Sequence, residues 1–246
     1  MHSTQFEIHD PGAGLLRPVL ELTAGEVRRQ RGSKARRPVL VAGLVGQTKQ
    51  ALAEAELARD LGYDCGMLSL GAMKSAGEDE LIVHCLQVAE VIPLFGFYLQ
   101  PAVGGRKLSF AFWRRFAEIP GVVAVKIAPF NRYQTLDVVR AVDEAGRAGE
   151  ISLYTGNDDS IVHDLVTECR FASSGGRRRL RMVGGLLGQW AMWTRKAVEL
   201  LAEVKEAFVT GTVSSGLLTL GAQLTDANGA LFDAAHSFAG CIPGIH

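Results

Sequence analysis

Short apolar runs alternate with amphipathic stretches along almost the whole chain, and this alternation constrains the fold more than any other feature. The runs are bounded by Gly, Pro or polar residues, which is typical of buried strands, and each is followed by apolar residues at helical spacing. A regular strand–helix alternation with short loops predicts a parallel sheet with helices outside it. The expected strands are 38–43, 65–70, 93–99, 122–129, 151–156 and 181–186, and the expected helices are 48–61, 78–91, and stretches starting near 109, 131, 158, 188 and 214.

Among parallel architectures, the chain fits a TIM (β/α)8-type barrel best. A doubly wound sheet usually has a G-x-G-x-x-G turn after its first strand, and neither 43–46 nor 184–188 matches it. If 3–8 is the end of a strand, seven βα units are visible, so we expect the leading unit to be missing. We therefore predict an N-terminally incomplete barrel domain over 1–210 and a C-terminal helical extension over 211–246, packed on the barrel.

Composition excludes several classes of function. Lys+Arg and Asp+Glu number 26 each, and this balance argues against a nucleic-acid partner, which would require a basic excess. The basic clusters 28–37 and 177–181 read as solvated connections. The four cysteines are far apart, no histidine spacing fits zinc, and no run is long enough to cross a membrane. These features predict a cytoplasmic protein without a metal site.

One lysine interrupts the most apolar of the expected strands. In Val-Val-Ala-Val-Lys-Ile-Ala-Pro, at 122–129, the charged residue is Lys126. Burying a lysine is costly unless its amine is neutral or paired. Two interpretations are open: Lys126 lies just past the strand and reaches water, or its amine has a chemical role. In a barrel, the second interpretation is favoured because the C-terminal ends of the strands carry the chemistry.

Tyr98 lies near the end of the neighbouring expected strand, 28 residues before Lys126. This pair and its flanks, Phe-Tyr-Leu-Gln-Pro-Ala-Val-Gly-Gly-Arg at 97–106 and Ile-Pro-Gly-Val-Val-Ala-Val-Lys at 119–126, resemble the dihydrodipicolinate synthase / N-acetylneuraminate lyase family of Schiff-base aldolases. Tyr-Thr-Gly-Asn-Asp at 154–158 resembles the family's next strand end. Ser3 and Thr4 stand where the family keeps a hydroxyl pair.

The resemblance implies a class I aldolase or lyase that acts on pyruvate or a related 2-oxo acid. Lys126 would form the imine, and Tyr98 would transfer protons. Ser3, Thr4 and Gly156 would contribute to substrate binding. Neither cofactor nor metal is implied, and the family's members are often homo-oligomers. Each role has a structural alternative: Tyr98 as a packing aromatic whose hydroxyl bonds the backbone, Ser3 and Thr4 as an ordinary polar strand end, and Gly156 as a turn residue.

Two departures from the family bear on the substrate. The loop 69–74 has no aromatic residue where synthase members have one, and 101–105 has the longer spacing that lyase-like members show. We therefore expect a lyase or aldolase for another 2-oxo acid rather than the lysine-pathway synthase. A barrel that binds or senses a 2-oxo acid without turnover and an inactive barrel fragment are the remaining alternatives.

Overall fold

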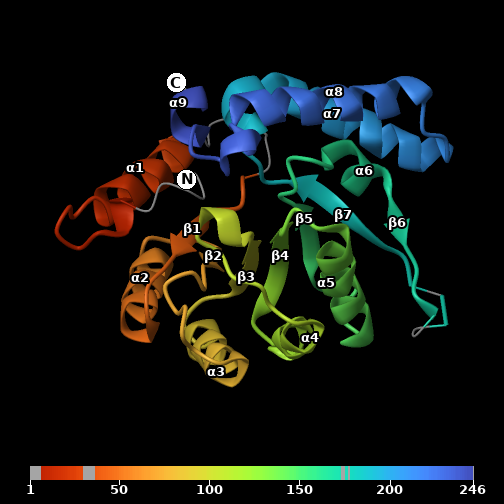
Figure 1. Ribbon diagram of the computed structural model, residues 1–246. Helices are drawn as coiled ribbons and strands as arrows, with labels where there is room; N and C mark the ends of the chain where they lie inside the picture. The colour runs from red at the N-terminus through yellow and green to blue at the C-terminus, as the bar shows by residue number, and fades with distance from the viewer. Residues whose placement is uncertain (1–6, 30–36, 173–174, 177, 246) are drawn as a thin grey trace. The chain divides into compact units, whose positions relative to one another are not determined.

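The structure is a computed structural model that describes residues 7–29, 37–172, 175–176 and 178–245 (Figure 1). Ser3 and Thr4 therefore lie outside the described residues. The strands are β1 Val41–Leu44, β2 Cys65–Leu68, β3 Leu94–Leu99, β4 Val122–Ala128, β5 Ser152–Thr155, β6 Glu168–Cys169 and β7 Leu180–Gly185. The helices are α1 Leu16–Arg29, α2 Thr48–Asp60, α3 Glu78–Ala89, α4 Phe110–Glu118, α5 Arg132–Glu144, α6 Ile161–Val166, α7 Gln189–Thr210, α8 Ser215–Leu231 and α9 Cys241–Ile245.

Two compact units make up the chain, one of residues 1–97 with 119–123 and the other of 98–118 with 124–246. In the first unit, β1, β2 and β3 pair in parallel and in that order. Ala51, Ala55 and Ala58 of α2 are fully buried, because small side chains let a helix approach a sheet closely. The expected strand at 3–8 is wrong for its described part, since Glu7–His9 forms a 3-10 helix.

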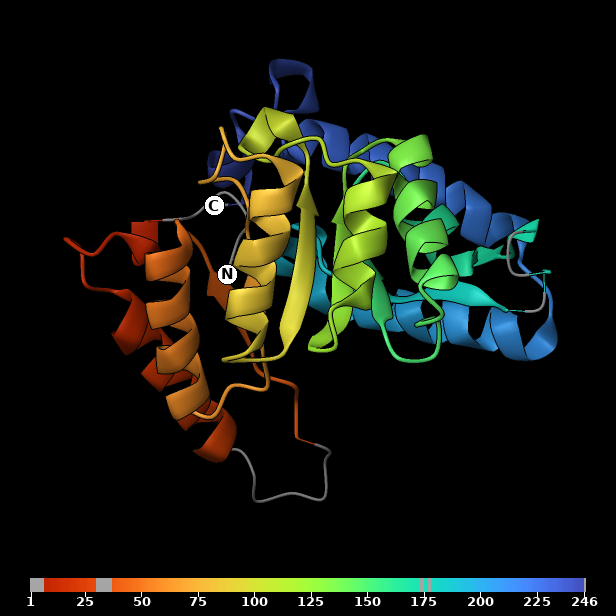
Figure 2. The same ribbon diagram turned by 90° about the horizontal axis from the view of Figure 1, so that it is seen from below.

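The second unit contains the end of β3, followed in order by β4, β5, β7 and β6. β4, β5 and β7 run in parallel, as the alternation predicts. β6 is antiparallel to β7 and forms a short hairpin that the sequence pattern does not predict. In this unit α4 and α5 lie on one side of the strands, and α7 and α8 lie on the other (Figures 1 and 2).

The helical spacing of Trp190, Trp193, Leu200 and Val204 predicts that they share the inner face of α7, and this prediction is only partly correct. Leu200 and Val204 are buried, but Trp190 and Trp193 are each 37% exposed. The backbone at Trp193 leaves helical geometry, with φ −133° and ψ 48°, so the helix is kinked there. This kink breaks the 3.6-residue periodicity, and the two tryptophans therefore do not continue the buried stripe.

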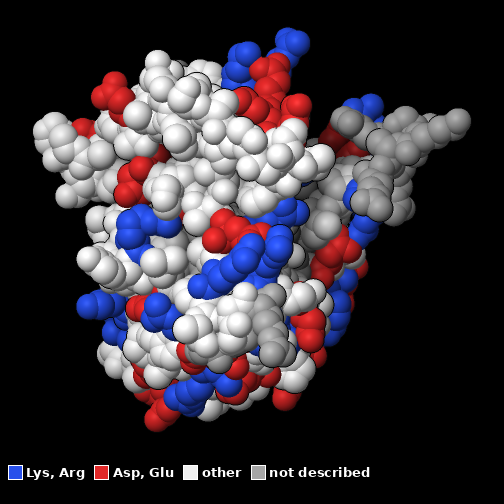
Figure 3. Space-filling model, turned by 90° about the vertical axis from the view of Figure 1, so that its right-hand side faces the viewer, with Lys and Arg blue, Asp and Glu red and all other residues white. Residues whose placement is uncertain are grey.

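Charged side chains of both signs mix on the face that carries the β6–β7 hairpin (Figure 3). Arg170 and Arg179 both pair with Glu168, and Arg178 pairs with the buried Asp143. The described part of the second basic cluster is thus largely neutralised by neighbouring carboxylates, as expected of a solvated connection. Within the described ranges, no helix combines the length and hydropathy that a membrane span requires.

Candidate active site

β4 presents Lys126 on the face of the strands opposite α5 and α6. Ile127 and Thr155 are register partners, and the Thr155 hydroxyl donates to Asp164 of α6 at 2.6 Å. Successive side chains of a strand point to opposite faces, so Lys126 and its partner Tyr154 point the other way. This is the face on which α7 and α8 lie (Figure 2).

The surroundings of Lys126 disfavour its charged form. The Lys126 side chain is partly buried, on a strand whose other residues are all apolar. Burial lowers the pKa of the Lys126 amine from 10.5 to about 8, against the opposing effect of the Asp158 carboxylate, which favours the ammonium. A substantial share of the amine is therefore neutral at slightly alkaline pH, which is the form that attacks a carbonyl.

One glycine makes room for this lysine, and a second lies against its register partner Tyr154. A side-chain carbon on Gly156 would lie 2.7 Å from the Cβ of Ala128 and 2.8 Å from the Cε of Lys126. A side-chain carbon on Gly184 would lie 3.2 Å from the Tyr154 ring. Gly156 is thus placed against the lysine side chain, and its role in substrate binding remains a prediction. Tyr154 is a phenol beside Lys126 that the sequence analysis did not single out.

Tyr98 is almost fully buried, with 1% of its surface exposed. Its hydroxyl lies 3.0 Å from Oε1 of Gln134 and 3.2 Å from the carbonyl of Leu108, to either of which it can donate, and it accepts from the N–H of Leu108 at 3.3 Å. Its ring packs on Trp113 of α4, with the centroids 5.0 Å apart. The backbone contact that the packing alternative predicts is therefore present. The contacts with Trp113 and Gln134 are with α4 and α5, on the other side of the strands from the face that presents Lys126, so the structure does not bring Tyr98 and Lys126 together. The proton-transfer role remains a prediction.

Gln134 reaches Tyr98 because α5 begins where it does. The side chain of Asn131 caps the helix by accepting from the N–H of Gln134 at 3.1 Å, as the sequence predicts. The capping contact fixes the first turn of α5 directly after β4. The Gln134 amide is then available to hold the phenol, a contact between distant segments that no local pattern indicates.

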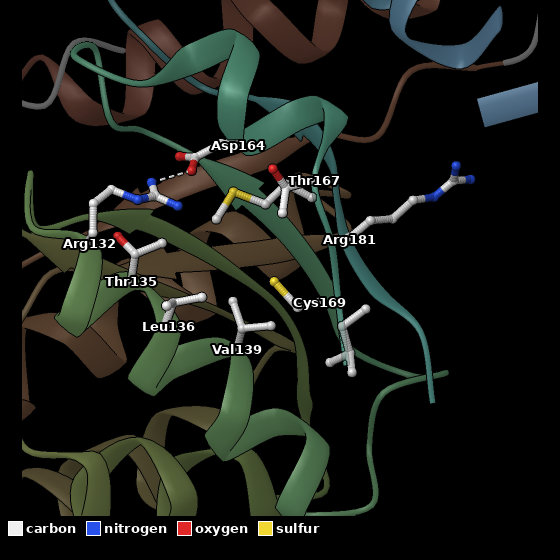
Figure 4. A pocket seen from close by; sticks show the side chains of 10 residues that line it. Arg132, Thr135, Leu136, Val139, Asp164, Thr167, Cys169 and Arg181 are labelled. Carbon is white, nitrogen blue, oxygen red and sulfur yellow. Dashed lines mark hydrogen bonds and ion pairs between the residues drawn. The ribbon is translucent and has the colours of Figure 1, made fainter. Parts of the chain in front are cut away.

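A buried polar network fixes the chain after β5. Asn157 donates to Asp164 at 2.9 Å and to Thr135 at 3.1 Å, and Arg132 pairs with the same Asp164. Arg132, Thr135 and Asp164 line one cavity (Figure 4). Its volume of about 10 Å³ suits a single water, so this cavity is too small for a substrate. The network is therefore a support for the segment that carries Gly156.

Asp158 follows this support and is held from α8. Its backbone carbonyl accepts from the side chain of Asn228 at 3.0 Å, and the next carbonyl, of Asp159, accepts from Thr225 at 2.9 Å. An aspartate directly before a helical stretch usually caps it, so the sequence predicts Asp158 or Asp159 as the cap of α6, and it likewise predicts Asn228 as a helix cap. Both predictions are wrong, because Ser160 is the residue before α6 and Asn228 lies inside α8. An asparagine inside a helix is a signal that could have indicated a tertiary contact.

Comparisons with known proteins confirm the resemblance. No protein-family model matches the chain. The 4-hydroxy-tetrahydrodipicolinate synthase of Thiobacillus denitrificans is 28% identical over 149 residues, which are 60% of this chain and 45% of that protein. The chain thus spans less than half the length of this curated relative.

Solved structures establish the fold class. YagE, a prophage protein of the dihydrodipicolinic acid synthase family from Escherichia coli K12 solved in complex with pyruvate, aligns with a TM-score of 0.71 at 16% identity, over 95% of this chain and 70% of that one. Dihydrodipicolinate synthase from Bacteroides thetaiotaomicron aligns with a TM-score of 0.68 at 17% identity, over 96% of this chain and 72% of that one. A monomeric dihydrodipicolinate synthase variant aligns with a TM-score of 0.62 at 18% identity, over 89% of this chain and 63% of that one. The predicted TIM-barrel fold class is confirmed by these likenesses.

The pKa of Lys126 predicts how stability depends on pH. The folded state disfavours the ammonium form of Lys126, and this lowers the free energy of unfolding. The loss of stability is fully present below pH 8 and disappears as the pH rises toward 10.5. Lys126→Met should therefore raise the free energy of unfolding at pH 7 by roughly 1–3 kcal/mol. It should also flatten the rise of stability between pH 8 and 10.5, measured by urea unfolding.

Lys196→Met is the matched control, because Lys196 lies on α7 with 74% of its side chain exposed and paired to Glu199. It should leave the shape of the pH profile unchanged. A Lys126→Met protein as stable as the parent or less stable at pH 7, with the alkaline rise intact, would contradict the desolvation of the amine.

Proposed function

We propose that this chain, which resembles the dihydrodipicolinate synthase family, is a class I aldolase or lyase in which Lys126 forms an imine with a 2-oxo acid. One observation carries the proposal. The only break in the apolar run of β4 is an amine whose pKa burial lowers to about 8. The pyruvate named with YagE supports the substrate class.

The reaction follows from the chemistry of the amine. The neutral nitrogen of Lys126 bonds to the ketone carbon of the substrate, and the ketone oxygen leaves as water. The resulting iminium draws electrons from the carbon next to it, so the adjacent C–C bond can break to give an enamine or form by the reverse step. Water then releases the product and restores the amine.

The other residues would bind the substrate and move protons. By the resemblance, Tyr98 would transfer the proton that accompanies C–C bond making or breaking, and its hydroxyl would first have to leave Leu108 and Gln134. Ser3, Thr4 and the backbone near Gly156 would hold the substrate carboxylate. No metal or other cofactor enters this scheme, since the iminium supplies the electrophile. We also propose that the protein acts in the cytoplasm and forms a homo-oligomer. The reaction scheme requires neither this location nor this oligomeric state.

Reductive trapping tests the imine directly. Incubation with pyruvate and borohydride should add one reduced pyruvyl group to the protein, which peptide mapping by mass spectrometry should place on Lys126. Lys126→Ala should abolish the adduct, and Lys196→Ala should leave it unchanged. An unmodified Lys126 in the parent protein, with pyruvate and with larger 2-oxo acids, would exclude the imine mechanism.

Tyr98→Phe should separate imine formation from proton transfer. The variant keeps the ring that packs on Trp113 but loses the hydroxyl, so pyruvate should still be trapped on Lys126. Exchange of the pyruvate methyl protons with D2O reports enamine formation and should slow by about 100-fold or more. The exchange is followed by proton NMR.

The stability of Tyr98→Phe must be measured beside its exchange rate, because loss of the hydroxyl contacts costs about 1–2 kcal/mol of folding free energy. A folded variant with an unchanged exchange rate would leave Tyr98 a packing residue only. Trapping of pyruvate in the parent without exchange or turnover would favour the alternative of a 2-oxo acid binding protein.

A further inference from the structure

Asp158 is a second ionisable side chain that interacts with Lys126, and the proposed scheme does not use it. It comes two residues after Gly156, whose α-carbon lies against the Lys126 side chain. Its carboxylate and the Lys126 ammonium attract each other. The end of β5 thus brings a carboxyl group toward the amine that attacks the substrate.

The chain around Asp158 is held through its backbone carbonyls. Asn228, which is 3% exposed, donates to the Asp158 carbonyl, and Thr225 donates to the Asp159 carbonyl. The Oδ1 atom of Asp158 is inaccessible to solvent and has no hydrogen-bond partner among the described residues. Native proteins rarely leave a buried acceptor unsatisfied, and such an atom is a reason to look for a chemical role.

Burial, more than the charges facing it, favours the protonated form of Asp158. Burial raises the pKa of its carboxyl group from 3.8 to about 7, the attraction of Lys126 opposes this rise, and the neighbouring Asp159 adds to it. Asp159 itself faces Asp164 and Arg132, whose charges act on it in opposite directions. Burial thus favours the neutral form of both the Asp158 carboxyl group and the Lys126 amine, which brings their proton affinities closer together than those of an ordinary aspartate and lysine.

We propose that Asp158 is the proton-exchange partner of the Lys126 amine during imine formation. This inference rests on the proposed function. It assigns Asp158 to the formation of the imine, whereas Tyr98 serves the C–C bond step that follows.

Asp158 would give and regain one proton during imine formation. The Asp158 carboxylic acid gives its proton to the ketone oxygen as the neutral nitrogen of Lys126 bonds to the ketone carbon. The carboxylate then takes one proton from that nitrogen, which leaves a neutral carbinolamine. The regained proton goes to the carbinolamine hydroxyl, the C–O bond breaks and water departs. The iminium remains with the Asp158 carboxylate as its counter-ion, so the pair is neutral in total before and after.

The rate of trapping by pyruvate and cyanoborohydride, measured from pH 5 to 10, tests the proposal. Asp158→Asn removes the acid but also a negative charge that favours the ammonium, so the Lys126 pKa should fall further. If Asp158 acted through its charge alone, the variant would therefore be trapped faster at pH 7. As proton partner, its loss should instead slow trapping by about 100-fold, with the pH midpoint moved downward.

Asp159→Asn is the matched control, since it removes a carboxylate from the next residue and should keep the trapping rate within about threefold of the parent. Asp158→Ser opens space at the same position, and added formate should restore part of the trapping rate that this variant loses. If Asp158 had only a structural role, formate would not restore the rate. Asp158→Ser also serves if Asp158→Asn does not fold.

The outcomes separate the two proposals. Absence of an adduct in the parent protein would overturn the imine mechanism itself. An adduct in the parent, with Asp158→Asn or Asp158→Ser trapped as fast or faster at pH 7 and no effect of formate, would overturn the role of Asp158 alone.

Discussion

The desolvation of one amine governs the chemistry of this chain. Lys126 is placed on an otherwise apolar strand, where water cannot solvate its charge fully, and its pKa falls to about 8. The same surroundings oppose folding, because the protein must bury a group that prefers water. Gly156 leaves space for this side chain, and α8 supports the backbone of the segment that follows Gly156. Strain of this kind is expected where a site is used for chemistry.

The sequence predicts most of the second unit and much of the first. The strand at 122–129 and the strand at 93–99 agree with β4 and β3 within one residue, because long apolar runs between Gly and Pro leave few alternatives. Asn131 caps α5 as expected. The β6–β7 hairpin was not predicted, since β6 has only two residues and no alternation to detect. Local periodicity also cannot show that α7 is kinked at Trp193.

The site itself could be predicted only in part. Lys126 and Gly156 are brought together, but Tyr98, at the end of the neighbouring strand, contacts α4 and α5 on the other side of the strands. Asp158, Asn228 and Gln134 were missed or misassigned, because their contacts join segments up to 70 residues apart and leave no local trace. Asp158 was interpreted as a helix cap, which is what an aspartate before a helix usually is. Its position relative to the amine is a property of the fold.

The pKa of Lys126 in the unliganded protein is the most direct test of this account. Lysine labelled with ¹³C at Cε gives one correlation that is absent from Lys126→Met and can be followed by NMR from pH 6 to 11. The account predicts a midpoint near 8, well below the 10.5 of an ordinary lysine. A midpoint at or above 10.5 would mean that the amine is solvated, and it would remove the physical basis for Lys126 as the nucleophile.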